Sequence, residues 1–315
     1  MNFLAIFIAL LLEQARPLAP GNAPHRLAHA WASWTQKSLD AGHTVQAWLV
    51  WGLAAALPTV CSALIYHLLW QVSVLLALAW MVGVLYLTLG FRQFSHHFSV
   101  IREALGAGDD VSARAELARW KQVDASLLPR TELLRQVIEY AVIAAHRHVL
   151  GVLFCFVLLA ALGLGPAGAV LYRMSELLHR KWWAEQPVVN APSSELQLVS
   201  STAWHWVDFL PVRVTGLAFA VVGNFEEAVA AWRQDASRFA NANDGVVLAA
   251  TSGAIDVRLL TGAYSSAHTG LGEDLESMAQ EPQQGHLASV VGLVWRSVVL
   301  WLLLLALMLL ARLVG

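Results

Sequence analysis

QAWLVWGLAAALPTVCSALIYHLLWQVSVLLALAWMVGVLYLTLGF, residues 46–91, contains two long apolar runs that decide the fold. The runs cover 46–67 and 72–91, and each has about the 20 residues that a membrane-spanning helix needs. Only the four residues LLWQ separate them, so the two helices must turn back on each other as an antiparallel hairpin. Pro58 lies in the middle of the first run and predicts a kink, which neighbouring helices can accommodate.

The composition of the whole chain agrees with a lipid environment. Of the 315 residues, 57% are hydrophobic and 13% are charged, whereas soluble domains carry about 25% charged residues. The formal net charge of -2 argues against a nucleic-acid partner, which would require a clustered basic surface. Cys61 and Cys155 both lie in apolar runs and are expected to be buried rather than disulfide-bonded.

Further apolar stretches extend the predicted membrane domain. Spans are expected at 149–172, at 209–225 where the stretch is short, and at 290–313. Residues 1–12 are too few for a full span and predict a half-span or an interfacial helix. We therefore predict an all-α, polytopic integral membrane protein with four to five transmembrane helices, forming one domain over residues 1–315.

Within the span at 149–172, three glycines are expected to allow close packing of helices, and a proline to allow a bend. They are Gly163, Gly165, Gly168 and Pro166.

Two long polar segments connect the spans. Residues 92–148 carry helical patterns broken at GAGDD, with Pro129 starting a further helix, and the distribution of Arg and Lys places this segment in the cytoplasm. Asp109 and Asp110 in GAGDD could hold a cation, but capping of the next helix is the favoured interpretation. Residues 226–287 are acidic and rich in Gly, Ser, Asn and Gln from Asn241 onward, which predicts a loose loop.

No metal or cofactor motif is recognised. The chain has twelve histidines, but neither the HExxH nor the CxxC pattern of zinc sites occurs. A phosphate-binding glycine loop ending in Lys-Ser/Thr is also absent, and GLGPAG lies inside an apolar span where it serves packing. We therefore predict no metal and no cofactor.

Charged residues inside or beside apolar spans are the candidate functional residues, because a charge in lipid is costly and usually has a partner. Arg213 follows Pro211, and the nearest acid is Asp208, five residues earlier; Glu139 is a weaker partner. An Asp208–Arg213 pair would either anchor the helix entrance or bind an anionic substrate, and the structural role is favoured. Snorkelling to the membrane surface is the favoured interpretation for Arg147 and Arg296. The candidate polar cluster comprises Glu139, His146, Arg147, His148, Asp208, Pro211 and Arg213.

Four stretches occur in an order typical of one group of membrane proteins. They are LLLEQARPLAPGNAPHRL (10–27), YLTLGFRQFSHHFSVIREALGAGDDVSARAELARW (86–120), GVLFCFVLLAALGLGPAGAVLYR (151–173) and VDFLPVRVTGLAFAVVGNFEEAVAAW (207–232). Together they resemble the superfamily shared by the CobD/CbiB cobalamin-biosynthesis proteins and the AmpE-type inner-membrane proteins linked to β-lactamase induction. The fourth stretch is the most specific, and it resembles the AmpE-type pattern more closely.

The chain departs from the CbiB pattern at three polar signatures. An acidic, Asn-bearing signature is replaced by IAAHRHVL (143–150), which has neither an acid nor an asparagine. After Tyr172, the family's NTLDSM gives way to RMSELLHR, which keeps only Glu176. Trp204 and His205 stand where a paired Asp and Asn are expected, leaving Asp208. Since phosphoryl or adenylyl chemistry needs oxygen ligands for a divalent cation, the loss argues against that catalysis.

The resemblance therefore implies a bacterial, multi-pass inner-membrane protein, and we predict a non-catalytic role in cell-envelope or β-lactamase-induction signalling. Its expected partners are the lipid bilayer and other inner-membrane or envelope proteins. The alternative is a divergent adenosylcobinamide-phosphate synthase-like enzyme, which joins an aminopropanol-type amine to a corrinoid substrate. A transporter is less favoured because no inverted repeat is visible.

Overall fold

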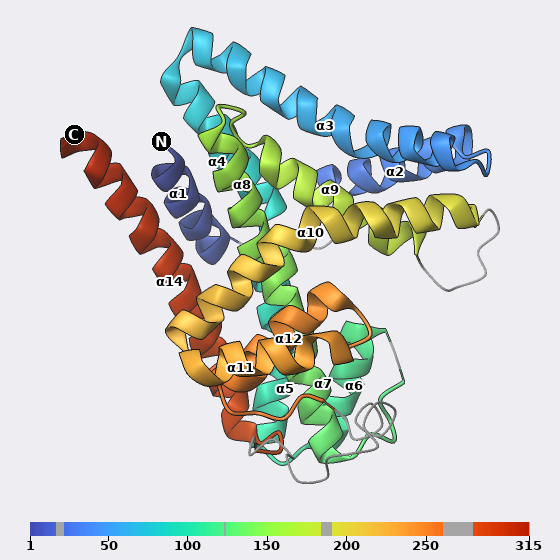
Figure 1. Cartoon of the computed structure of the whole chain (residues 1–315), viewed down its shortest axis with the longest axis vertical. Helices are drawn as coiled ribbons and strands as arrows, with labels where there is room; N and C mark the ends of the chain where they lie inside the picture. The colour runs from blue at the N-terminus through green and yellow to red at the C-terminus, as the bar shows by residue number, and fades with distance from the viewer. Residues whose placement is uncertain (17–21, 123, 184–190, 261–279, 315) are drawn as a thin grey trace. The chain divides into compact units, whose positions relative to one another are not determined.

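The computed structural model describes residues 1–16, 22–122, 124–183, 191–260 and 280–314, and these residues are almost entirely helical (Figure 1). Within those ranges the β-structure is limited to an isolated bridge between Val257 and Gln280. The predicted all-α class is confirmed. The helices group into two compact units, named here unit 1 (Met1–Gly90 and Arg147–Pro211) and unit 2 (Phe91–His146 and Val212–Gly315).

Four helices are long and apolar enough to cross a membrane: Thr44–Val72, Arg130–Ala161, Ser194–Val222 and Gln284–Ala311. Two shorter apolar helices, α1 (Asn2–Ala15) and α4 (Val74–Thr88), accompany them. The number of membrane-length helices among the described residues agrees with a polytopic membrane protein. The predicted short span at 209–225 corresponds to the second half of α10 (Ser194–Val222), a helix that starts well before it and contains Pro211.

The hairpin of unit 1 pairs α3 (Thr44–Val72) with α4. Helix α3 continues through LLWQ because no residue there interrupts it, and Pro58 lies within the helix. The turn comes at Ser73, whose Oγ accepts a hydrogen bond from the Leu75 amide at 3.2 Å and so caps α4. The second run thus forms a helix of 15 residues, shorter than the predicted span.

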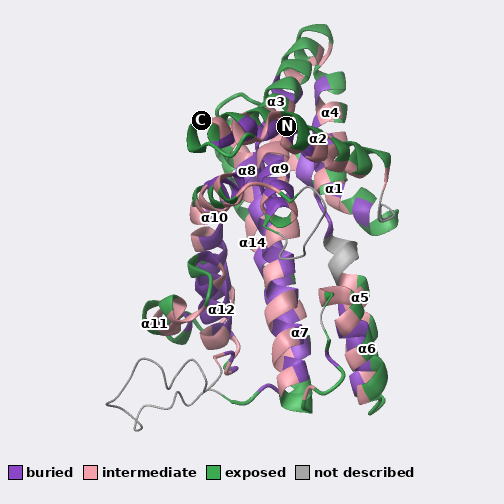
Figure 2. Cartoon of the chain, turned by 90° about the vertical axis from the view of Figure 1, so that its right-hand side faces the viewer, coloured by how far each residue is buried: buried purple, intermediate pink, exposed green. Residues whose placement is uncertain are grey.

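Unit 1 also holds α2 (Ala23–Leu39) and a second hairpin of α8 (Gly151–Ala161) with α9 (Ala167–Trp182). The structure therefore differs from the single span expected over 149–172. Gly163 and Gly165 both have positive φ and form the turn between the two helices, a conformation that suits glycine. A Cβ at Gly168 would overlap the backbone carbonyl of Cys155, so the two helices meet backbone to backbone. Most residues of α9 are buried (Figure 2).

Unit 2 contains the helices of the polar segment, α5 (Phe91–Gly106), α6 (Asp110–Lys121) and α7 (Arg130–Ala145). Asp109 caps α6 by accepting a hydrogen bond from the Ser112 amide at 2.9 Å, as the capping interpretation of GAGDD expects. Pro129 precedes the first residue of α7. A π-helical turn, His146–Leu150, joins α7 to α8.

The predicted loose loop at 226–287 is instead helical over its first part. It contains α11 (Phe225–Asp235), a 3-10 turn (Ala236–Arg238) and α12 (Ala242–Ala254), and α14 (Gln284–Val314) begins near its end. Asn241, one of the polar residues that suggested a loop, caps α12 by accepting a backbone hydrogen bond, and Asn224, just before the predicted loop, caps α11 in the same way. The small residues allow close packing: a Cβ at Gly253 would overlap the Glu227 carbonyl. Residues 261–279 of this loop, and 17–21 of the first family stretch, lie outside the described residues.

Candidate functional site

A group of charged residues on α9 in unit 1 surrounds one buried carboxylate. The spacing of Arg173, Glu176 and Arg180, three and four residues apart, places them on one face of the helix. Glu176 is 4% exposed. One carboxylate oxygen lies 3.2 Å from Nη1 of Arg173, and the other lies 3.6 Å from Nε of Arg180. Two guanidinium groups thus share one buried carboxylate.

Electrostatics keep Glu176 ionised. Burial alone would raise the pKa of the Glu176 carboxyl, but Arg173 and Arg180 outweigh it and hold the pKa at about 2. Arg147 and His148 also interact electrostatically with this carboxylate. Burial lowers the pKa of Arg173. Glu176 offsets this effect only in part, because its carboxylate is shared with Arg180. The cluster is therefore held as ions and carries an excess of positive charge.

A second set of contacts connects two of the predicted residues. The hydroxyl of Tyr172 donates to a carboxylate oxygen of Asp208 at 2.8 Å, and both side chains are fully buried. The Tyr172 ring lies 5.2 Å from that of Trp204, and the guanidinium carbon of Arg147 lies 5.8 Å from the Trp204 ring centre. The space for Tyr172 depends on Gly151, where a Cβ would overlap the phenol.

Some buried polar atoms of unit 1 have no hydrogen-bond partner among the described residues, and they include Nδ1 of His148 and Oγ of Ser175. Ser175 is next to Glu176 in α9 and is fully buried. Such atoms are costly to bury without a partner and are often found where a ligand supplies it.

Helix α2 contributes two histidines near the charged group. The Nε2 atoms of His25 and His29 lie 3.0 Å apart. Burial, the neighbouring His25 and the cations Lys181 and Arg180 lower the pKa of His29 to about 4. Lys181 donates to the backbone carbonyl of His29 at 3.0 Å. Because a neutral histidine adds no charge, the positive charge of this region comes from arginine and lysine.

The structure places the predicted candidate residues in two different units. Arg147, His148, Asp208 and Pro211 belong to unit 1, where Asp208 and Arg147 are joined through Tyr172 and Trp204. The backbone carbonyl of His148 also accepts a hydrogen bond from the Gly90 amide at 3.3 Å.

The other three, Glu139, His146 and Arg213, belong to unit 2. Glu139 forms an ion pair with Arg135, and Nδ1 of His146 lies 2.9 Å from the Thr215 hydroxyl. The pairing of Asp208 with Arg213 stays a prediction. Arg296 donates from Nε to the Gly292 carbonyl, one turn earlier in α14.

Sequence reasoning missed Arg173 and Arg180 as members of the site. It treated them as polar residues after a span that was expected to end at Tyr172. The signal that could have found them was the spacing in YRMSELLHR, where an acid is flanked by arginines at three and four residues.

A divalent cation such as Mg²⁺ would need oxygen ligands that converge on one point. The part of the chain that the structure describes holds no group of three or more His, Cys, Asp or Glu side chains arranged to bind a metal. Both carboxylates of the site already have partners, Glu176 two arginines and Asp208 a tyrosine. The side chains here do not fit a resident cation, whereas arginines in excess of carboxylates fit an anion.

Comparison with known proteins gives a consistent result. Residues 3–294 match the family described as CobD/Cbib protein. The chain is 28% identical over 313 residues to "Cobalamin biosynthesis protein CobD" of Stutzerimonas stutzeri (strain A1501), covering 96% of each protein. A protein of the same name from Chromobacterium violaceum is 30% identical over 182 residues, covering 58% of this chain and 55% of the relative. No solved structure matches.

These matches correct one prediction and support others. The expected role in β-lactamase-induction or envelope signalling is wrong, because the similar proteins are named for cobalamin biosynthesis. Lipid as the main environment is supported by the apolar helices. The four membrane-length helices and the family match together identify a multi-pass inner-membrane protein, as predicted.

Proposed function

Because the chain belongs to the CobD/CbiB family, we propose that it is a membrane enzyme of cobalamin biosynthesis. Its reaction is of the adenosylcobinamide-phosphate synthase type, in which an aminopropanol-type amine forms an amide bond with a corrinoid side-chain carboxylate. A nucleoside triphosphate would activate the carboxylate, whose oxygen would leave with the transferred phosphate as the amine nitrogen attacks. The names of the two similar proteins support the pathway, and the arginines around Glu176 on α9 support an anionic group on the substrate.

The observation that carries the proposal is the excess of cations around the buried carboxylate of Glu176: the partly buried Arg173 and the more exposed Arg180. Joining an amine to a side-chain carboxylate requires binding of that carboxylate, and a phosphate on either reactant adds further negative charge. Guanidinium groups bind carboxylate and phosphate through paired hydrogen bonds. Arg173 and Arg180 share one acid between them, so each has donors left for such an anion.

The neighbouring residues have roles that follow from their contacts. Glu176 positions the two guanidinium groups, and Tyr172 holds Asp208 through its hydroxyl. Nδ1 of His148 and Oγ of Ser175 are buried atoms to which a bound substrate can hydrogen-bond. Burial of Glu176, Tyr172 and Asp208 strengthens the interactions that these side chains make, because water is excluded from them.

The sequence departures also support a divergent enzyme. RMSELLHR (173–180) replaces a family signature, and it is the stretch that supplies Arg173, Glu176 and Arg180. The polar residues of the family signature are thus replaced by Arg173, Glu176 and Arg180 at the same place in the chain. Such an exchange changes how the anion is bound without removing the site.

Growth of a deletion strain tests the proposal. Deletion is expected to make the bacterium dependent on added cobalamin, and adenosylcobinamide phosphate is expected to restore growth. Arg180→Gln should fail to complement the deletion, whereas the matched control Arg26→Gln, an exposed arginine of α2 in the same unit, should complement fully. Immunoblots of membranes establish that both variants accumulate equally.

Two results contradict the proposal. If the deletion strain grows normally without added cobalamin, the protein does not act in cobalamin biosynthesis. Full complementation by the double variant Arg173→Gln/Arg180→Gln, at normal membrane yield, would show that these arginines do not bind the substrate.

A further inference from the structure

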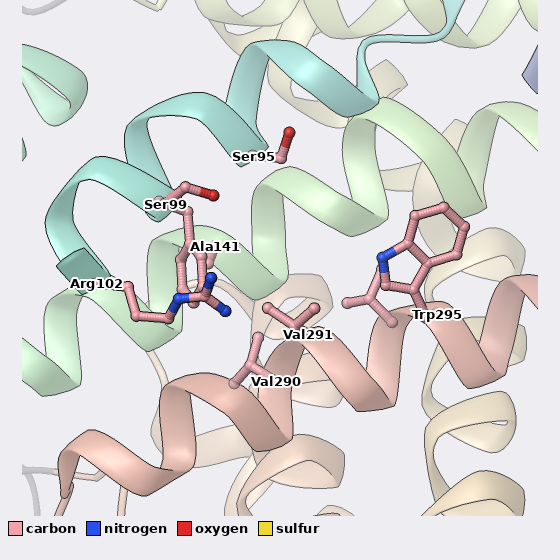
Figure 3. Close-up of a pocket in the computed structure, with 9 residues that line it drawn as sticks. Ser95, Ser99, Arg102, Ala141, Val290, Val291 and Trp295 are labelled. Carbon is pink, nitrogen blue, oxygen red and sulfur yellow. The ribbon is translucent and has the colours of Figure 1, made fainter. Parts of the chain in front are cut away.

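A cavity of about 160 Å³ lies in unit 2 between α5, α7 and α14 (Figure 3). Its lining shares no residue with the arginine cluster and contains both polar and apolar side chains, among them Phe98 of α5. Helix α5 supplies polar side chains, Ser95, Ser99 and Arg102, four and three residues apart on one helix face. Helix α14 supplies apolar side chains that include Val290, Val291 and Trp295.

Arg102 of α5 differs from the arginines of the two helices that follow it. Those of α6 and α7 form ion pairs, for example Arg119 with Glu116 and Arg130 with Asp110. Arg102 is half-buried, and no hydrogen bond or ion pair joins it to any other residue that the structure describes. Figure 3 shows its guanidinium directed into the space between α5 and α14. A cation in such a place is available to an external anion.

The position along α14 indicates the level of the cavity in the membrane. Val290 to Trp295 lie near the start of the membrane-length helix Gln284–Ala311, which at 1.5 Å per residue is about 9–17 Å from its first residue. Trp295 is 40% exposed, and tryptophan prefers the boundary between headgroups and acyl chains. Farther along, α14 exposes apolar side chains of the kind that face lipid: Val299, Leu303, Leu304, Leu307 and Met308.

We propose that this cavity binds the phosphate headgroup of an anionic phospholipid. Arg102 pairs with the phosphate, Ser99 donates a hydrogen bond to it, and the acyl chains follow the exposed apolar face of α14. The volume suits a phosphate with part of its glycerol, and leaves the chains outside. Basic pockets beside transmembrane helices recognise anionic lipids by this combination of charge and apolar contact.

Native mass spectrometry of the full-length protein, released from detergent micelles, tests the proposal. The protein is incubated with phosphatidylglycerol or with phosphatidylcholine, and the retained lipid is counted. We expect a preference for phosphatidylglycerol that Arg102→Gln reduces roughly fivefold, the factor that corresponds to about 1 kcal/mol per basic residue at a membrane surface. Arg102→Lys should keep most of the preference because the charge is retained.

The matched control is Arg233→Gln, which removes the same charge from an exposed position of unit 2 and should leave the preference unchanged. Equal retention of both lipids by the unmodified protein overturns the proposal without any variant. An equal loss in Arg233→Gln also overturns it, since net charge alone would then explain the preference. Displacement of phosphatidylglycerol by millimolar inorganic phosphate would assign the cavity to free phosphate instead of lipid.

Discussion

Replacing Glu176 by glutamine removes the carboxylate that Arg173 and Arg180 share, while keeping nearly the same shape. The partly buried guanidinium of Arg173 and the more exposed guanidinium of Arg180 then remain beside each other without the buried carboxylate that compensates them. Breaking a buried ion pair in this way destabilises proteins far more than breaking a surface pair. We therefore expect Glu176→Gln to lower the free energy of unfolding substantially.

The magnitude follows from the pKa of the carboxyl. It is about 2 in the folded protein against an ordinary value of 4.5, a difference worth about 3 kcal/mol by proton linkage. Because the folded-state pKa is depressed, this stabilisation is fully present above the ordinary pKa. It is lost as the pH falls through the folded value. Glu176→Gln should thus cost about 3 kcal/mol at neutral pH, and progressively less as the solution is acidified.

Thermal unfolding in detergent micelles, followed by circular dichroism at neutral and acidic pH, measures this difference. Glu103→Gln is the matched control, since it makes the same substitution at an exposed position of α5 and should be close to neutral at every pH. A destabilisation by Glu176→Gln that stays constant from neutral pH to below about pH 3 would refute the electrostatic reasoning. It would show that glutamine acts through packing alone.

Three further changes test the packing and capping described above. Gly168→Ala should destabilise the α8–α9 hairpin severely because its methyl group meets the Cys155 carbonyl, whereas Gly83→Ala, with open space around it, should be neutral or stabilising in the same unfolding assay. Tyr172→Phe should cost about 2 kcal/mol of unfolding free energy, since Asp208 loses a buried hydroxyl donor; an unchanged midpoint would contradict that bond. Asn241→Ala should cost about 1 kcal/mol by removing the cap of α12, measured as increased amide exchange in residues 242–254.

Apolar length was enough to predict the class of the fold, because lipid imposes one rule on every spanning segment: its backbone must be satisfied within a helix. Helix ends were harder to predict. The turn between α8 and α9 depends on the positive φ of Gly163 and Gly165, and in an apolar stretch these glycines are equally typical of packing residues. The region of α11 and α12 was wrongly predicted as a loop. Asparagine is typical of loops and also of helix caps, and here Asn224 and Asn241 cap the two helices.

The candidate site was predictable only in part. Asp208 and Arg147 were identified because a charge beside an apolar run is conspicuous in a sequence. Their connection through Tyr172 and Trp204 required the tertiary structure, since aromatic residues are common throughout this chain. Arg173 and Arg180 were overlooked because the span was expected to end at Tyr172, so neither was considered as a partner of a buried acid.

The function was inferred wrongly for a related reason. The missing acids and asparagines of the family signatures indicate lost catalysis only if the anion is always bound through a divalent cation. Arginine offers a different solution, because a guanidinium supplies both the charge and the directed hydrogen bonds that a cation and its ligands would otherwise provide.

The burial of the shared acid distinguishes the charged cluster of α9 from the ion pairs of unit 2. In unit 2, Arg114 and Arg130 also share one acid, Asp110, but the side chain of Asp110 is 26% exposed, so water compensates the remaining charge. On α9 two arginines share Glu176. Burying charge without full compensation is costly, and a bound anion recovers that cost. We therefore expect an anionic group of the substrate to bind beside the arginines that share Glu176.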